Sequence, residues 1–321
     1  MKIISQLSIA AAVLGLASMA WGQAYPSKPV RVIVPFGAGS GSDVGLRVLA
    51  ESLSRTTGQS FLAENRPGAA GNIGVAAGAK APPDGYTLVT GGLGVNAMNQ
   101  FFYSPAEMGF DPVKDLEPII LTAKLPFMIA VSPSFAASSV SELIAAAKAN
   151  PGTINVAVTQ TTTRMLLELF GRTTGAPLFP VDYKAAGPAL TDVMSGRVSV
   201  GMETVAALRP HVVSGRLKAV AVTSRKTSEL LPNVTSVAEQ GVKDFEFVGW
   251  ISLYAPKGTP REIVNLLNVE LNKALTQADI RKRFLDLGFE PGAGSPQDLA
   301  DFENSERRRW GPLIKSANIT P

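Results

Sequence analysis

Pro29-Val30-Arg31-Val32-Ile33-Val34-Pro35 is the stretch that decides the fold, because a β-branched run between two prolines predicts a short buried strand. The glycine-rich segment 36–43, FGAGSGSD, follows directly, and segment 44–55 carries apolar residues at positions 44, 46, 48, 49 and 53. That spacing places the apolar side chains on one face of a helix with Ser42 or Asp43 as its N-cap. The stretch therefore predicts a strand, a glycine loop and a helix in succession.

The alternation of strands and helices continues along the chain and predicts mostly parallel sheets flanked by helices. The later strands are predicted at 87–90, 127–131, 155–158, 198–202 and 219–223, and the helices at 139–149, 163–172, 189–195, 206–214, 263–277 and 297–317. These are too many strands for one short sheet. We therefore expect an α/β fold of two lobes with a ligand cleft between them.

We expect the chain to pass between the two lobes twice. It crosses near Leu125-Pro126 and returns near 247–250. Lobe 1 is then 23–125 plus 248–321, and lobe 2 is 126–247, which agrees with the usual size of two domains.

The N-terminal segment has the pattern of a secretory signal. Lys2 is followed by the apolar run 9–16 and by Ala20-Trp21-Gly22, a small-residue cleavage site before Gln23. The segment is interrupted by polar residues and is shorter than the roughly 20 apolar residues of a membrane span. We expect cleavage between Gly22 and Gln23 and a periplasmic mature protein.

Composition excludes several classes of function. The sequence has no cysteine, so disulfides, thiolate metal sites and a lipid-anchored cysteine are excluded. Its 30 Lys and Arg residues exceed its 26 Asp and Glu residues only slightly, and no basic run is interleaved with aromatics, so no nucleic-acid partner is expected. Asp111, Asp115 and Glu117 come closest to an acidic cluster, but we expect a solvated turn leading into a helix. No metal and no cofactor are expected.

The glycine loop is not a nucleotide-binding motif. Gly37, Gly39 and Gly41 do not have the G-x-G-x-x-G spacing, and no P-loop Lys follows them. Backbone N–H groups at a helix start nevertheless suit a carboxylate. A tight turn that only packs helix against strand explains the glycines equally well.

Hydrolase chemistry is the main enzymatic alternative. The one histidine, His211, follows Pro210 on a predicted helix, and the sequence contains no G-x-S-x-G elbow. We therefore expect no catalytic residues, and a hydrolase acting in the same cleft is the minority hypothesis.

Several unusual strings occur in an order that resembles the Bug, or tripartite tricarboxylate transporter, substrate-binding proteins. They are YPSKP at 25–29 with PFG at 35–37, ENRPGAAGNIG at 64–74, PDGYTL at 83–88, DPVKDL at 111–116, YK at 183–184, PALTD at 188–192, PHV at 210–212 and GRLKA at 215–219. The resemblance covers essentially the whole mature chain.

The resemblance implies a monomeric, two-lobed binding protein that closes on a small organic carboxylate, a mono- or dicarboxylate, aliphatic or aromatic. It implies delivery to a membrane permease with one large and one small subunit. The alternative is a periplasmic co-sensor for a two-component signalling system.

The resemblance also implies which residues contact the ligand, grouped in loops from both lobes. They are Phe36, Gly37, Ala38, Gly39, Ser40, Gly41 and Ser42 in the first loop, Gly92 and Gly94 in the second, and Thr159, Thr161, Thr162, Thr163, Arg164, Ala186, Gly187 and Glu203 in lobe 2.

Two of these positions keep open alternatives. Family members often carry a glycine-containing string before the lobe 2 helix, whereas segment 158–164 here is shorter and has no glycine. Arg164 either pairs with a second ligand carboxylate or points to solvent. Glu203 repels a carboxylate, holds an amine or hydroxyl, or caps the helix that follows Thr204.

Two further segments have alternatives. The string 65–74 is expected to be a rigid scaffold turn rather than a ligand loop. Trp250 either walls the cleft or packs the hinge.

Overall fold

The computed structural model describes residues 25–317, so the predicted signal segment 1–22 lies outside the described residues. The quoted stretch forms β1 (Val30–Val34), and the next segment forms α2 (Gly41–Thr57). The helix starts earlier than expected, and its N-cap is Ser40, whose Oγ accepts from the Asp43 amide, rather than Ser42 or Asp43. The Asp43 carboxylate is turned back onto the loop instead, where it accepts from the Gly39 amide at 2.9 Å.

The first lobe contains the sheet half in which β1 pairs in parallel with two neighbours. These are β2 (Phe61–Asn65) and β3 (Thr87–Gly92). β3 then pairs antiparallel with β9 (Val248–Pro256), which pairs antiparallel with the long β4 (Leu116–Val131). The short β10 (Glu290–Pro291) also lies along β4.

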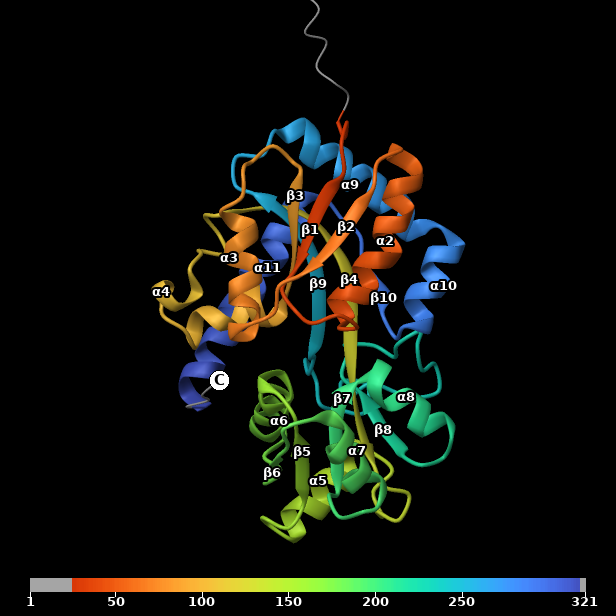
Figure 1. Cartoon of the computed structure of the whole chain (residues 1–321). Coiled ribbons are helices and arrows are strands. Elements are labelled where there is room, and N and C mark those ends of the chain that lie inside the picture. The colour runs from red at the N-terminus through yellow and green to blue at the C-terminus, as the bar shows by residue number, and fades with distance from the viewer. Residues whose placement is uncertain (1–24, 318–321) are drawn as a thin grey trace, which may run out of the picture.

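The second lobe contains the other half of the sheet. β4 pairs antiparallel with β7 (Val200–Thr204) and with β8 (Lys218–Val222). β5 (Asn155–Val158) is parallel to β7 and to β6 (Phe179–Asp182). The two-lobed α/β fold is confirmed (Figure 1). Its sheet is mixed rather than mostly parallel, because within residues 25–317 the four parallel strand pairs are joined by five antiparallel ones, all of which involve β4 or β9.

β4 runs through both lobes, and its register shows where it changes neighbours. It pairs with β9 as far as Pro126, opposite Val248, and with β7 from Phe127, opposite Thr204. The sequence predicted only the last five residues of β4 as a strand, and a helix after the 111–116 turn; that helix is wrong. The apolar segment contains Pro118, which a helix interior disfavours, and the register shifts beside it absorb the missing N–H.

Helices flank both halves of the sheet (Figure 1). In the first lobe they are η2 (Ala69–Gly71), α3 (Asn72–Ala79), the π-helical η3 (Leu93–Met98), η4 (Asn99–Phe101), α4 (Pro105–Met108), α9 (Arg261–Thr276), α10 (Ala278–Asp286) and α11 (Pro296–Ala317). In the second lobe they are α5 (Val140–Ala149), α6 (Thr161–Thr174), α7 (Ala186–Met194) and α8 (Val205–Val213). The string 65–74 connects β2 to α3, as a scaffold turn would.

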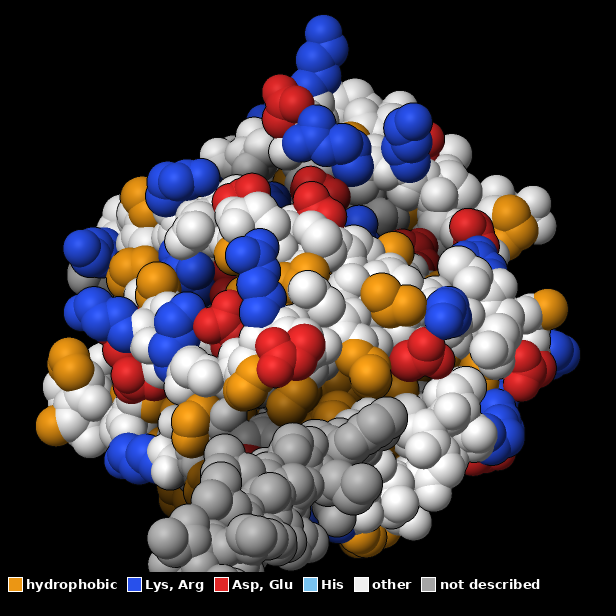
Figure 2. Space-filling model, turned by 90° about the horizontal axis from the view of Figure 1, so that it is seen from above, with side chains coloured by type: hydrophobic (Ala, Val, Ile, Leu, Met, Phe, Trp, Pro, Cys, Tyr) orange, Lys and Arg blue, Asp and Glu red, His pale blue; other side chains and the backbone are white. Residues whose placement is uncertain are grey.

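Surface charge is mixed in sign. Seen from above the first lobe, Lys and Arg side chains are interspersed with Asp and Glu (Figure 2). Among residues 25–317, no helix combines the length and the apolar composition that a membrane span requires.

Aromatic rings join the lobes where the chain crosses between them. The ring centroids of Phe127 and Phe247 lie 5.1 Å apart, and those of Phe247 and Trp310 lie 5.2 Å apart, both edge to face. Trp310 on α11 is fully buried. This cluster ties β4, the entry to β9 and α11 into one unit beside the cleft.

Trp310→Ala removes the largest ring of this cluster. We expect it to lower the free energy of unfolding by about 3–5 kcal/mol, because truncating a buried aromatic residue leaves a cavity. Urea unfolding measures the loss. The exposed Val213→Ala serves as control and should change stability by less than about 0.5 kcal/mol. Equal stability of the two variants would contradict the packing described.

Candidate functional site

A cleft of about 300 Å³ lies where the two lobes meet. Its walls come from loops of the first lobe, from the crossing strands β4 and β9, and from helix starts of the second lobe. The lining residues are Phe36, Ser40, Gly41, Ser42, Gly92, Leu93, Gly94, Val95, Leu125, Phe127, Gln160, Thr162, Thr204, Gly249, Trp250 and Ile251.

Within residues 25–317, four helical segments begin at this cleft. The N-cap residues of α2, η3, α6 and α8 are Ser40, Gly92, Gln160 and Thr204, and all of them line it. The first N–H groups of a helix have no intrahelical acceptor and carry the positive end of the helix dipole. Helix starts from both lobes therefore face one small volume.

The lining combines neutral donors with apolar walls. Of the described residues that line the cleft, none is Lys, Arg or His. The polar side chains belong to Ser, Thr and Gln, and the apolar wall includes Leu125, Phe127 and Trp250. Such a site can hold an anionic group by backbone amides and hydroxyls while it covers a hydrocarbon body.

Asp43 holds the first glycine loop in shape. It is buried and accepts from the Gly39 amide at 2.9 Å and from Asn65 Nδ2 at 3.0 Å, while Arg47 forms an ion pair with it at 3.0 Å. Burial acts to raise the pKa of Asp43, but the hydrogen bonds from Arg47, Gly39 and Asn65 outweigh burial and lower it. Asn65 also donates to the Phe36 carbonyl at 3.1 Å, so β2 supports the loop.

Glu203 organises the helix starts of the second lobe. Its Oε1 accepts from Thr159 Oγ1 at 3.0 Å and from Gln160 Nε2 at 3.3 Å, and its Oε2 accepts from the Thr204 amide at 3.1 Å. Burial raises the pKa of Glu203, although these three hydrogen bonds act in the opposite direction. Glu203 is thus linked to both N-caps, Gln160 and Thr204, from behind the cleft wall.

The structure places the predicted ligand residues in two groups. Those that line the cleft are Phe36, Ser40, Gly41, Ser42, Gly92, Gly94 and Thr162. Those that lie outside the lining are Gly37, Ala38, Gly39, Thr159, Thr161, Thr163, Arg164, Ala186, Gly187 and Glu203.

Arg164 and Thr163 have partners within the second lobe. Arg164 Nη2 lies 2.5 Å from Asp182 Oδ1, at the end of β6, and its side chain is 25% exposed. Thr163 Oγ1 accepts from the Thr159 amide at 3.1 Å and from the Gln160 amide at 3.2 Å. Thr163 therefore stabilises the turn that presents Gln160 and Thr162 to the cleft, and Arg164 links the first turn of α6 to the end of β6.

Sequence reasoning missed several lining residues. Gln160 was missed because the helix was expected to start at Thr163, whereas α6 begins at Thr161. Thr204 and Phe127 were missed because they meet only through the pairing of β4 with β7, and Leu125 because it reaches the cleft through the pairing of β4 with β9. Trp250 lines the cleft and also donates from Nε1 to Glu306 at 3.3 Å, so it both walls the cleft and packs the hinge.

The histidine considered for enzymatic chemistry and the acidic residues considered for a metal can be placed in the structure. His211 lies on α8, outside the lining, and burial lowers its pKa. Within residues 25–317, no three His, Cys, Asp or Glu side chains gather closely enough to hold a metal ion.

A family description matches residues 46–319: tripartite tricarboxylate transporter family receptor. The chain belongs to this family. Protein BugT of Bordetella pertussis is 33% identical over 316 residues, which cover 98% of this chain and 97% of that protein.

Solved structures show the same fold. The R. palustris protein Rpa4515 with adipate is 36% identical, with a TM-score of 0.80 over 92% of this chain and 99% of that one. MatC from Rhodopseudomonas palustris with bound malate is 28% identical, with a TM-score of 0.74 over 90% of this chain and 100% of that one.

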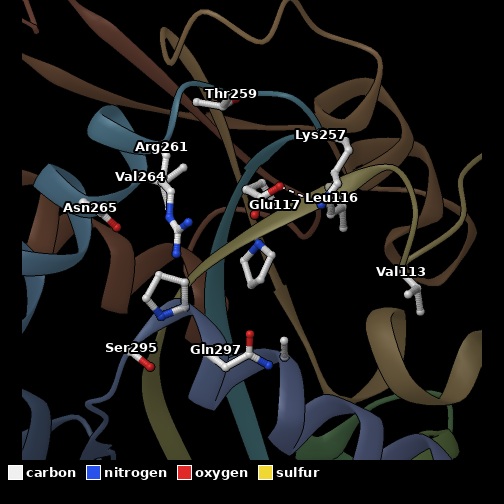
Figure 3. Close-up of a pocket in the computed structure, with 13 residues that line it drawn as sticks. Val113, Leu116, Glu117, Lys257, Thr259, Arg261, Val264, Asn265, Ser295 and Gln297 are labelled. Carbon is white, nitrogen blue, oxygen red and sulfur yellow. Dashed lines mark hydrogen bonds and ion pairs between the residues drawn. The ribbon is translucent and has the colours of Figure 1, made fainter.

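A larger cavity of about 670 Å³ lies within the first lobe, between β4, α9 and the start of α11 (Figure 3). Arg261, Asn265 and Gln297 project toward it, and Lys257 Nζ pairs with Glu117 Oε2 at 2.7 Å on its wall. Its described lining includes no residue of the second lobe and no predicted ligand residue. Lobe closure cannot enclose a ligand there, so the cleft is the better candidate.

Asp43→Asn should loosen the glycine loop, because the neutral amide cannot replace a carboxylate that accepts from Gly39, Asn65 and Arg47. We expect a loss of about 1–3 kcal/mol at neutral pH. Since the folded pKa of Asp43 is lowered, the stabilisation is present above the unfolded pKa of about 3.9 and is lost as pH falls through the folded pKa.

Urea unfolding of both proteins, at neutral pH and at about pH 3, measures this difference. The exposed Asp301→Asn is the control. A difference between wild type and Asp43→Asn that was as large at the acid pH as at neutral pH would contradict the role assigned to the Asp43 charge.

Proposed function

We propose that this protein captures a small organic carboxylate in the cleft between its lobes, without changing it chemically. The observation that carries the proposal is the convergence of four helix starts, within residues 25–317, on one cleft whose described lining has no cationic side chain. Oriented amides stabilise a buried carboxylate, whereas a neutral ligand would leave their positive potential uncompensated. Similar proteins have been solved with adipate, at 36% identity, and with malate, at 28% identity, which supports this ligand class.

The helix starts from opposite lobes suit a mono- or dicarboxylate with an apolar body. One carboxylate would lie at Ser40, Ser42 and Gly94 in the first lobe. A second would lie at Gln160 and Thr204 in the second lobe, and Leu125, Phe127 and Trp250 would cover the aliphatic or aromatic part between them.

Closure of the lobes would bury the ligand. We propose that residues 23–125 with 248–321 move as one body and 126–247 as the other. The change of β4 partners between Pro126 and Phe127 supports this division. Hinged closure of this kind is known for periplasmic binding proteins.

We further propose that the mature protein works in the periplasm and hands its ligand to a membrane permease with one large and one small subunit. The signal pattern at 1–22 and the family membership support this. A deletion strain should lose uptake of the labelled carboxylate. Normal uptake with lost induction of a target gene would instead favour the co-sensor.

Gly94→Asp tests the cleft directly. A Cβ at Gly94 meets no atom within 4 Å, so the side chain fits, but it places a negative charge where a carboxylate should lie. We expect adipate affinity, measured by calorimetry, to fall by at least about tenfold, because like charges in a desolvated site repel.

Ala145→Asp is the matched control for this experiment. It adds the same charge at an exposed position of α5, outside the lining and outside the predicted ligand residues. It should keep wild-type affinity. Equal affinities for wild type and Gly94→Asp would place the ligand elsewhere.

A further inference from the structure

Helix α11 carries the ion pair Glu303–Arg307, whose side chains are largely buried next to the first-lobe wall of the cleft. Arg307 Nη1 donates to the Asn96 carbonyl at 3.2 Å and lies 3.4 Å from Glu303 Oε2, while its Nη2 donates to Asn304 Oδ1 at 3.0 Å. The Arg307 side chain is 11% exposed and that of Glu303 is 4% exposed. The guanidinium is therefore held on one side by its own helix and on the other by η3.

Asn96 connects this ion pair to the cleft. Its Oδ1 accepts from the Gly92 amide at 3.0 Å, and Gly92 is both the N-cap of η3 and a lining residue. The backbone at this connection is tightly packed and leaves no room for a side chain. A Cβ at Gly91 would lie 2.1 Å from Asn96 Oδ1, and one at Gly92 would lie 2.5 Å from the Trp250 carbonyl oxygen.

Glu303 reaches the second wall of the cleft. Its Oε1 accepts from Tyr254 Oη, which in turn accepts from Ser252 Oγ at 2.6 Å. Ser252 and Tyr254 are buried on β9, the strand whose residues Trp250 and Ile251 line the cleft. The Glu303–Arg307 pair thus bridges β9 and η3 behind the ligand position.

We propose that Arg307 is a positioning residue of the cleft. By its hydrogen bond to the Asn96 carbonyl it fixes the position of η3 relative to the cleft, and Glu303 holds the Arg307 guanidinium in that orientation. This inference rests on the proposed function, because it assigns the η3 amides to the ligand. It makes α11, which lies outside the lining, a determinant of affinity.

The bridge should respond to pH. Burial raises the pKa of Glu303 to about 7, although Arg307 acts to lower it. The titratable groups in contact with Glu303 are Arg307 on its own helix and Tyr254 on β9, and the nearby Glu306 pairs with Arg309 at 3.5 Å. Protonation below that pKa removes the charge that orients Arg307, so the ligand should bind more weakly at acid pH.

Calorimetric titration with adipate and with malate tests the proposal in the full mature chain. At about pH 8, Arg307→Met should bind roughly five- to tenfold more weakly than wild type, as the loss of one charge-assisted hydrogen bond implies. Arg307→Lys should restore part of the affinity. The neighbouring, exposed Arg308→Met is the matched control and should bind as wild type does.

The pH profile separates positioning from a general loss of stability. Wild-type affinity should fall from about pH 8 to about pH 6, a range in which the ligand carboxylates stay largely ionised, whereas Glu303→Gln should bind weakly and almost equally at both. Parallel profiles for wild type and Glu303→Gln, or wild-type affinity in Arg307→Met, would overturn the inference while leaving carboxylate capture supported.

Failure of both acids to bind the wild-type protein would count against the proposed function alone. Hydrogen exchange of the ligand-free proteins still tests the positioning role of Arg307 in that case. Arg307→Met should speed exchange in peptides covering 92–98 and leave those of α5 unchanged. Unchanged exchange at 92–98 would overturn the positioning role.

Discussion

The pairing of β4 with strands of both lobes is the constraint on which the rest of this structure depends. β4 pairs with β9 in the first lobe and with β7 and β8 in the second, so its middle residues, Leu125 and Phe127, form the floor of the cleft. The lining loops after β3 and β7 follow strands that pair with β9 and β4, and those after β1 and β5 follow strands that pair with β3 and β7 in turn. The helix starts can face one another only because the sheet halves share a continuous backbone.

Within that frame, the cleft attracts an anion by geometry rather than by cationic side chains. Each helix start supplies only a partial charge, but the low dielectric of a closed cleft strengthens all of them together. Buried acids stand behind the wall: Asp43 shapes the first loop, Glu203 links the N-caps of α6 and α8, and Glu303 orients Arg307. These charges act through the backbone, which lets one scaffold accept ligands with different bodies.

Local patterns predicted much of this molecule, and long-range pairing set the limit. The β-branched run at 30–34 and the glycine loop led to β1, α2 and the first-lobe wall, and the number of predicted strands led to the two lobes. The length of β4 was missed because its prolines resemble breaks, whereas register shifts accommodate Pro118. Thr204 reaches the cleft by pairing opposite Phe127, which is 77 positions away in the chain. Arg164 pairs with Asp182. Neither contact has a local sequence signature.

The central claim is that oriented amides in a cleft without cationic lining residues select for carboxylate charge. The most direct measurement compares the dissociation constants of adipate and of its neutral diamide, which has the same carbon chain, by titration calorimetry. The account predicts that the diacid binds at least about a hundredfold more tightly, since the neutral diamide has no charge to compensate the positive potential of the oriented amides. Equal affinity for the two compounds would contradict it.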